Sequence, residues 1–203
     1  MATQVRAAAR PRGEEQTRER ILAAAAEWFG THGYAATSIR DIARDVGVTV
    51  GAIYVHFPSK ERLLVAVYEE GVRRIGDAVD AVPGELAPWE RLERMAVAHL
   101  DALLDNAGYA RVIVRVIPGD VREAAKDLAH LRGGYEQRFR DIVESLELAP
   151  GTDRTLLRLQ LLGALNATHT WFKRGGGRIG TRQIARQFVA TIKSGAAPRK
   201  GRT

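Results

Sequence analysis

The sequence predicts an all-α protein in which a small N-terminal domain precedes a larger helical one. Apolar residues recur at helical spacing along almost the whole chain, and no segment shows the strict alternation that is typical of a β-strand. Glycine and proline interrupt the pattern at Pro83-Gly84, Pro118-Gly119, Pro150-Gly151 and 175–177. These interruptions divide the chain into segments of ordinary helix length, so we expect about nine helices.

The bulk composition limits the class of protein. With 203 residues the chain can form one well-buried core, or a small module attached to a larger one. No apolar run approaches the roughly 20 residues that cross a membrane, and the N-terminus lacks the apolar centre of a signal peptide. The absence of cysteine excludes disulfides, thiolate zinc sites and a cysteine nucleophile. We therefore expect a cytoplasmic protein.

The net charge of +7 is unevenly distributed along the chain. Residues 175–203 hold seven basic residues and no acidic one, which leaves 24 basic and 24 acidic residues in 1–174. We expect the basic tail, 196–203, to be a solvated extension, with contact to DNA or to ligand phosphates as the alternative. Because the rest of the chain is balanced, charge alone supports a nucleic-acid partner only weakly.

The N-terminal segment predicts a basic arm followed by a helix. Residues 1–15 are rich in arginine and alanine, and we expect them to be disordered. Acidic residues around Thr17 favour the start of a helix near it, because they interact well with the positive end of the helix dipole. Apolar residues at helical spacing continue to about His32, and Gly33 is the expected C-terminal cap.

Two short helices with clear capping residues are expected next. Ser38, with an aspartate three residues later, forms a capping-box-like pair at the start of the second helix. Thr49 can cap a third helix, which Pro58 prevents from continuing. Ser59 then caps a long fourth helix over 59–81.

The second and third helices have the residue spacing of a helix-turn-helix. Ala43 lies where the helices must cross closely, Gly47 where the turn requires a positive φ, and Ile53 where the later helix fills the core. The later helix of such a unit enters the DNA major groove, so we expect a DNA-binding domain over 16–60. The side chains expected to pack against Leu22 and Phe29 of the first helix are Ile39, Ile42, Ala43, Val46, Val48, Ile53 and Phe57.

The outer face of the third helix supplies most of the expected DNA contacts. Thr49 and the free N–H groups at the helix start can meet phosphate. Val50 and Ala52 offer apolar surface for thymine methyl groups, while Gly51 allows the backbone to approach the groove. Sequence specificity is expected to rest on DNA shape together with Arg40 or Arg44. The polar and basic side chains expected to contact phosphate are Thr37, Ser38, Arg40, Tyr54, His56 and Lys60.

The chain after residue 60 continues with the helical period. We expect 61–195 to form a second domain, joined to the first through the long helix 59–81. Proline and glycine mark the breaks between its elements. The helices expected in this domain are 88–106, 109–117, 120–147, 153–174 and 181–195.

A specific residue pattern runs from the first helix to the beginning of the fourth. Its members are Thr17-Arg18-Glu19-Arg20-Ile21-Leu22, Phe29, Gly33-Tyr34, Thr37-Ser38, Ile42-Ala43, Gly47-Val48-Thr49, Gly51, Tyr54, His56-Phe57, Ser59-Lys60-Glu61 and Leu63-Leu64. The pattern resembles the DNA-binding domain of the tetracycline-repressor (TetR) family of transcriptional regulators. Val50 departs from the polar or basic residue that is usual at its position, which weakens the case for base reading there.

The resemblance implies that the larger domain dimerises and holds a small-molecule pocket. Two apolar helices from each subunit would then form a four-helix interface. The alternative is that the same apolar faces complete the core of a monomer, although a monomer cannot span two half-sites on DNA. The residues expected at the dimer interface are Leu157, Leu161, Ala164, Leu165, Ile184, Phe188 and Ile192.

Two further stretches are similar to TetR-family members that respond to acyl-coenzyme A thioesters. They are Leu161–Gly176 and the set Leu131-Arg132, Tyr135-Glu136 and Phe139-Arg140. Such a ligand needs an apolar cavity for the acyl chain and cations for the phosphates, to which Arg138 and Arg174 could also contribute. For each single residue, core packing or a solvated surface is the alternative. The candidate ligand-binding residues are Trp89, Met95, His99, Leu103, Arg111, Val112, Arg115, Val116, Arg132, Asn166, His169 and Trp171.

Together these features predict a transcriptional repressor rather than an enzyme. It would bind a palindromic double-stranded DNA operator as a homodimer and be released by a small-molecule effector, with an acyl-CoA thioester as the candidate. The five histidines show no metal-ligand spacing, and no phosphate-binding or nucleotide-binding glycine pattern occurs, so neither a metal nor a cofactor is expected. A regulator controlled by a protein partner instead of a small molecule is the remaining alternative.

Overall fold

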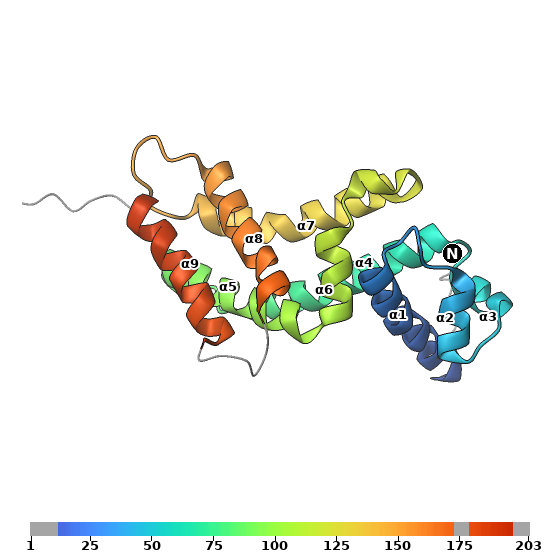
Figure 1. The fold of residues 1–203 in the computed structure, drawn as a ribbon. Helices are drawn as coiled ribbons and strands as arrows, with labels where there is room; N and C mark the ends of the chain where they lie inside the picture. The colour runs from blue at the N-terminus through green and yellow to red at the C-terminus, as the bar shows by residue number, and fades with distance from the viewer. Residues whose placement is uncertain (1–11, 173–178, 197–203) are drawn as a thin grey trace, which may run out of the picture.

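The computed structural model describes residues 12–172 and 179–196, and over these residues it is built from helices without a strand (Figure 1). The predicted all-α fold is confirmed. Residues 1–11 of the predicted arm and 197–203 of the predicted tail lie outside the described part of the chain. Its helices are α1 (Arg12–His32), α2 (Ile39–Val46), α3 (Val50–His56), α4 (Lys60–Asp80), α5 (Pro88–Asp105), α6 (Ala107–Arg115), the 3₁₀ helices η1 (Pro118–Asp120) and η2 (Arg122–Ala124), α7 (Ala125–Glu144), α8 (Arg154–Trp171) and α9 (Thr181–Ala196).

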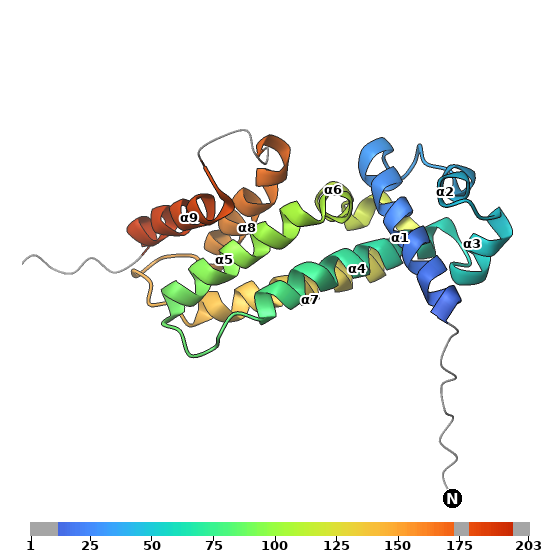
Figure 2. The ribbon, with the colours of Figure 1, turned by 90° about the horizontal axis from the view of Figure 1, so that it is seen from below.

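The molecule is elongated, with α1, α2 and α3 at one end and α8 and α9 at the other (Figures 1 and 2). Helix α4 leaves the small helical group and runs along α5 and α7, and it also contacts α1 and α6. It is therefore the covalent and packing link between the two ends. Within the described ranges, no helix combines the length and the apolar character that a membrane span requires.

Helix boundaries differ most clearly from expectation at three places. Helix α1 begins at Arg12, several residues before Thr17, so the last residues of the expected arm are helical. The helix expected over 120–147 is divided into η1, η2 and α7, because Asp120 accepts a hydrogen bond from the backbone N–H of Ile117 and closes a turn around Pro118. At the other end of the bundle, α8 stops at residue 171 instead of continuing to 174.

The capping residues are those that the sequence predicts. Ser38 and Asp41 form a complete capping box at the start of α2. The Thr49 hydroxyl accepts the backbone N–H of Ala52 at the start of α3. Gly47, which ends α2, has a φ of 74°, the left-handed conformation that the turn between the helices requires.

The hydrophobic core of the helix-turn-helix continues into the second domain. Its first cluster joins α1, α2 and α3 to the N-terminal half of α4 and to Tyr109 and Val112 of α6. Of the seven side chains expected to pack inside the helix-turn-helix, six are buried, while Val48 is partly buried against the same cluster. A second cluster gathers α5, α7, α8 and α9 at the far end.

The backbones of α1 and α6 come into contact where the two helices cross, because a glycine lies on each helix at this point. A Cβ atom added to Gly30 would lie 2.9 Å from the carbonyl oxygen of Gly108 and 3.0 Å from Cβ of Arg111. Around the crossing, Nη2 of Arg111 lies 2.5 Å from Oε2 of Glu27, and Nη1 of Arg115 donates to the carbonyl oxygen of Gly30 at 2.9 Å. The helix-turn-helix is thus fixed to α6 by close backbone packing and by two arginines.

We predict that Gly30→Ala destabilises the fold, because the new methyl group meets backbone that cannot move aside. The expected loss in the free energy of unfolding is about 1–3 kcal/mol, measured by urea denaturation. Gly133→Ala is the matched control, because a Cβ at this exposed position in α7 would have no neighbour within 4 Å. It should raise the free energy of unfolding by roughly 0.5–1 kcal/mol. Similar effects of both substitutions would contradict the close crossing.

Candidate functional site

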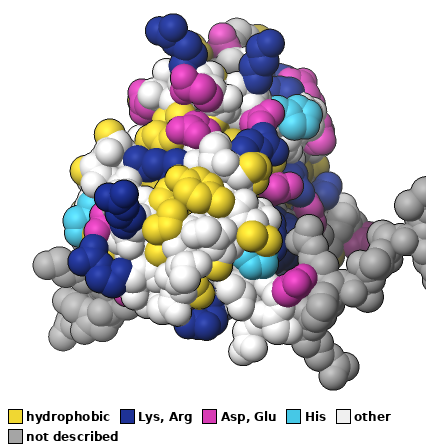
Figure 3. All heavy atoms as spheres, turned by 90° about the vertical axis from the view of Figure 1, so that its right-hand side faces the viewer, with side chains coloured by type: hydrophobic (Ala, Val, Ile, Leu, Met, Phe, Trp, Pro, Cys, Tyr) yellow, Lys and Arg dark blue, Asp and Glu magenta, His cyan; other side chains and the backbone are white. Residues whose placement is uncertain are grey.

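Helix α3 presents a largely apolar outer face at the end of the molecule. Ile53 is fully buried, whereas Tyr54 is 46% and Val55 82% exposed. Gly51, one helical turn before Val55, is also exposed, and a Cβ added there would meet only the Thr49 hydroxyl at 3.8 Å. Seen from this end, hydrophobic side chains occupy the middle of the face and several lysine and arginine side chains lie around them (Figure 3).

Val55 is a residue that the sequence interpretation missed. It lies four positions after Gly51 and therefore on the same side of the helix, so a helical projection of 50–56 would have found it. By contrast, Val50 and Ala52, the apolar contacts that were expected, are both half-buried. Val50 packs partly against the hydrophobic cluster below it. The apolar centre of the outer face is thus Val55.

The expected phosphate contacts on α2 include one correction. The Thr37 side chain is only 2% exposed, and its hydroxyl is used inside the protein, 2.8 Å from the carbonyl oxygen of Gly33 and 3.2 Å from that of Trp28. Ser38 and Arg40 lie on the surface as expected. The Thr37 side chain is therefore withdrawn from the predicted DNA-contacting set, because it fastens the end of α1 to the start of α2.

Lys60 is held at the start of α4 by neighbouring side chains. Its Nζ atom lies 4.3 Å from the centre of the Tyr34 ring, and burial lowers the pKa of its ammonium group. The Tyr34 hydroxyl donates to Oε1 of Glu61 at 2.7 Å, and burial together with this bond raises the pKa of the tyrosine. His56, at the end of α3, is half-buried with its ring beside that of Phe57.

A small central cavity lies between α4, α5, α6, α7 and α8. Its volume is about 30 Å³, roughly the space of one water molecule. Apolar side chains form most of the wall, and the polar groups come from α5, α7 and α8. The lining residues are Tyr68, Val72, Ile75, His99, Ile113, Arg132, Tyr135, Glu136, Leu162 and Asn166.

His99 is the buried polar group of the central cavity. It is 1% exposed, and burial lowers the pKa of its imidazole to about 4, so the ring is neutral at pH 7. Its Nδ1 atom lies 2.5 Å from the Tyr135 hydroxyl, whose pKa burial raises, so that the phenol keeps its proton. The phenol donates a hydrogen bond to Nδ1, so the hydrogen of the neutral imidazole ring lies on Nε2. Nε2 forms no hydrogen bond of normal geometry with the described residues, although the Asn166 side chain lies near the ring and acts to raise the pKa that burial lowers.

Two guanidinium groups share one carboxylate in the wall of the central cavity. Arg132 contacts Glu136 at 3.1 Å along α7, and Arg158 of α8 contacts the other oxygen of Glu136 at 2.5 Å. Arg158 is 7% exposed, so its charge depends on this partner. The pairing ties α7 to α8, and of its three members only Arg132 and Glu136 line the cavity.

A second, larger cavity lies between α5, α6 and the end of α8, and we name it the α6–α8 cavity. Its volume is about 420 Å³, within the range of small-molecule sites. It shares no residue with the central cavity. Its lining residues are Leu103, Leu104, Ala107, Ala110, Arg111, Arg115, His169, Thr170 and Phe172.

The single ligand pocket that the sequence predicted is therefore divided in two. His99, Arg132 and Asn166 line the central cavity. Leu103, Arg111, Arg115 and His169 line the α6–α8 cavity. The other five candidates line neither cavity, because helical periodicity shows which side of a helix is apolar but not which space that side faces.

These five candidates have other places in the fold. Met95, Val112 and Val116 are buried in the hydrophobic clusters. Trp89 packs against the second cluster with Nζ of Lys193 5.6 Å from its ring centre, and Trp171 is 53% exposed. These five residues are therefore core or surface residues instead of the ligand-binding residues that the sequence predicted. Arg174 lies outside the described residues.

The expected dimer residues also need correction. Five of them are buried within the protomer, namely Leu157, Leu161, Leu165, Ile184 and Ile192, while Ala164 and Phe188 are half-buried. The monomer-core alternative therefore holds for these side chains. The exposed side of α8 carries different residues at helical spacing, which we name the α8 outer stripe: Leu156, Leu159, Gly163 and Ala167.

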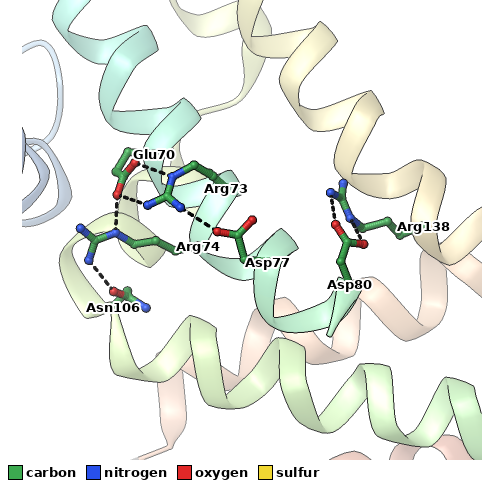
Figure 4. A network of polar contacts seen from close by, with 7 residues as sticks. All are labelled: Glu70, Arg73, Arg74, Asp77, Asp80, Asn106 and Arg138. Carbon is green, nitrogen blue, oxygen red and sulfur yellow. Dashed lines mark hydrogen bonds and ion pairs between the residues drawn. The ribbon is translucent and has the colours of Figure 1, made fainter. Parts of the chain in front are cut away.

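A network of ion pairs braces the middle of α4 (Figure 4). Glu70 accepts hydrogen bonds from Arg73 at 2.8 Å and Arg74 at 2.7 Å, and chiefly the Arg73 bond lowers its pKa to about 2. Arg73 also binds Asp77 at 2.6 Å, and Arg74 reaches the side-chain oxygen of Asn106, between α5 and α6, at 3.0 Å. One side of α4 is thus tied to the beginning of α6.

The end of α4 is tied to α7 by a two-pronged ion pair. Nε and Nη2 of Arg138 donate to the two carboxylate oxygens of Asp80 at 2.7 and 2.6 Å (Figure 4). Arg138 also lies 5.8 Å from the ring centre of Tyr135, the partner of His99. Tyr135, Arg138 and Asp80 thus form a continuous series of contacts from the wall of the central cavity to the end of α4.

Comparison with known proteins gives a consistent result over both ends of the chain. Residues 21–67 match the family model "Bacterial regulatory proteins, tetR family", and residues 85–196 match "Tetracyclin repressor-like, C-terminal domain". The chain is 26% identical to the transcriptional repressor KstR2 of Mycolicibacterium smegmatis over 198 residues, covering 91% of this chain and 92% of that protein. It is 31% identical to the repressor Rv3405c of Mycobacterium tuberculosis over 163 residues, covering 79% and 74%.

A solved structure with the same fold is that of the transcriptional regulator FadR from Bacillus subtilis in complex with stearoyl-CoA. The TM-score is 0.72 over 87% of this chain and 98% of that one. At 21% sequence identity, this likeness shows the fold alone.

We predict that Gly51→Leu strongly weakens DNA binding without destabilising the fold. The position is open within the protein, so a leucine would hold α3 away from the groove instead of disturbing the core. Fluorescence anisotropy with duplex DNA should show at least a tenfold loss of affinity, while the urea midpoint stays near that of the wild type. Gly133→Leu on α7 is the control and should bind DNA normally. Unchanged affinity of the Gly51 variant would remove α3 from the interface.

Proposed function

The chain belongs to the TetR family of bacterial regulatory proteins, and on that premise we propose that it represses transcription as a homodimer on a palindromic operator. In this proposal a small molecule releases it, and it acts in the cytoplasm, where the chromosome is accessible. The observation that carries the proposal is the outer face of α3, which is exposed although much of it is apolar.

The proposed DNA contacts combine apolar and polar groups. Val55 and Gly51 would face base edges, where a valine methyl group suits the methyl group of thymine. Thr49 and the N–H groups at the start of α3 would meet a phosphate. Tyr54 would contact the phosphate backbone of the adjoining DNA strand. The remaining positioning contacts would come from Ser38, Arg40, His56 and Lys60.

A dimer is needed because one α3 helix reads one half-site only. We propose that the α8 outer stripe forms the interface. Leu156 is 64% and Leu159 48% exposed, and such side chains gain most from burial against a second copy. Gly163 and Ala167 lie on the same side and would let a partner helix come close.

We propose that the effector enters the central cavity and that it is an acyl thioester. The apolar walls suit an acyl chain, and the Nε2–H of His99 can donate to a thioester carbonyl. The bound stearoyl-CoA in the structure of the B. subtilis FadR protein supports this class of ligand for the fold.

Entry of such a ligand requires the cavity to widen, since its volume is only about 30 Å³. Widening would push α7 away from α4, to which it is joined through Arg138 and Asp80. Because α4 leads directly to the helix-turn-helix, this movement would change the distance between the two α3 helices of a dimer. A coupling of about 1–3 kcal/mol between ligand and operator would be typical.

The proposed function can be tested by selecting bound duplexes from a random DNA pool, followed by release with decanoyl-CoA. We expect a palindrome whose half-sites are about one helical turn apart, because the two α3 helices must reach successive major grooves. Decanoyl-CoA should release the operator from the wild type and from the exposed control His130→Phe. His99→Phe should bind the operator but resist release. An asymmetric selected site would contradict the dimer, and normal release of the His99 variant would contradict the cavity.

Gly163→Arg should convert the dimer to a monomer. A Cβ at Gly163 has no neighbour within 4 Å inside the protomer, so only a partner subunit would be disturbed. Sedimentation at micromolar concentration should show a dimer for the wild type and for Gly133→Arg, and a monomer for Gly163→Arg. A dimeric Gly163 variant would place the interface elsewhere.

A further inference from the structure

We propose that the α6–α8 cavity is a second binding site, separate from the effector cavity, and that it takes an amphiphile with an anionic headgroup. The shared chemistry of the headgroup is that of a carboxylate or a phosphate. The volume of about 420 Å³ is large enough for a ligand without any rearrangement, in contrast to the central cavity.

The lining of the α6–α8 cavity combines an apolar surface with positive charge. Leucine, alanine and phenylalanine side chains make up the apolar part. Arg111 and Arg115 lie one helical turn apart on α6, and none of the described residues that line the cavity is acidic. The wall thus fits a ligand whose body is apolar and whose head is an anion.

Both arginines keep donors for a ligand. Arg111 uses Nη2 for Glu27, and Arg115 uses Nη1 for the carbonyl oxygen of Gly30. A guanidinium group has five N–H donors, so each arginine can also bind a carboxylate or phosphate oxygen. Nε of Arg111 is buried beside Gly30 at the α1–α6 crossing, so the donors left for a ligand are the other N–H groups of the two arginines.

His169 adds a directional group to the same wall. Its Nδ1 atom lies 2.7 Å from the backbone carbonyl oxygen of Asn166 and must donate to it, because a carbonyl oxygen only accepts. Its Nε2 atom therefore remains for a ligand.

Occupation of this site would act directly on α1. Among the described residues, the side-chain hydrogen bonds of Arg111 and Arg115 to α1 are those with Glu27 and with the Gly30 carbonyl. An anion bound to the remaining donors would draw the two guanidiniums toward the cavity, and it would in this way compete with Glu27 and the Gly30 carbonyl for them. It would thereby loosen the α1–α6 crossing without involving α4 or the central cavity.

The binding test uses isothermal titration of the full chain with octanoate, octyl phosphate and, as the uncharged analogue, 1-octanol. We expect both anions to bind at least tenfold more tightly than 1-octanol. A preference for octyl phosphate over octanoate, or the reverse, would identify the headgroup. Binding of 1-octanol as tight as that of the anions, or no binding of either anion at millimolar concentration, would overturn the proposal.

Substitutions in the α6–α8 cavity test whether the ligand binds there. Ala107→Glu places a negative charge at the exposed start of α6, where an acidic residue suits the helix dipole and can pair with Arg111 one turn later in place of an anionic ligand. It should weaken octanoate binding at least tenfold, whereas Ala107→Gln, of the same shape without the charge, should not. Arg115→Gln should act like Ala107→Glu, and the exposed control Arg94→Gln should bind normally. Loss of binding in His99→Phe instead would assign the ligand to the central cavity.

Hydrogen exchange tests the proposed effect on α1. Octanoate should speed amide exchange at residues 27–33 of the wild type severalfold, and it should leave exchange unchanged in Ala107→Glu. Unaltered exchange in the wild type with octanoate bound would overturn the competition with Glu27 and Gly30. None of these measurements uses DNA, so failure of the operator proposal can be told apart from failure of this one.

Discussion

The position of the whole DNA-facing end depends on the crossing of α1 over α6. Gly30 and Gly108 bring the two backbones into contact, and nothing larger than a hydrogen atom fits at Gly30 without a shift. The hydrophobic cluster beneath the helix-turn-helix includes residues of α6, so the two domains share one core instead of meeting across a linker. A displacement of α6 would consequently alter the packing of α1, because a closely packed interior has low compressibility and transmits strain.

The parts that the sequence predicted well are those that local chemistry decides. Ser38, Gly47 and Thr49 cap helices or turn the chain through contacts within a few residues, and each does in the structure what its residue type predicts. Ala43 and Ile53 likewise follow from short spacings. In such cases the partner of each group lies in the same short segment, and a linear pattern is sufficient.

The parts that the sequence predicted poorly depend on distant neighbours. Leu161 and Leu165 carry an apolar pattern that fits a dimer interface and a protomer core equally well, and only the position of α5 and α9 decides between them. Thr37 was expected on the surface because nothing nearby indicated that the end of α1 would cover it. Val55 was assigned neither to the core nor to the DNA-contacting set, and its 82% exposure is unusual for a residue type that is mostly buried.

Helix α6 occupies a special place in this arrangement, because it touches both cavities and also α1. Ile113 belongs to the wall of the central cavity, while Ala110 and Arg111 belong to that of the other. Helix α4 is held at Glu70 and Asp80 to the start of α6 and to α7. The two proposed ligand sites are thus connected to the helix-turn-helix through different contacts, one through α7 and α4 and the other through α6 and α1.

The exposed valine at the centre of α3 has a consequence for how the protein would distinguish one site from another. Contacts between arginine or lysine and phosphate weaken as salt displaces them, because counterions compete for the strands. A contact between aliphatic groups involves no ion and keeps its strength. Selection between DNA sequences that rests on Val55 would therefore persist at ionic strengths at which the affinity for DNA has fallen. Sequence selectivity and affinity would then vary independently with salt.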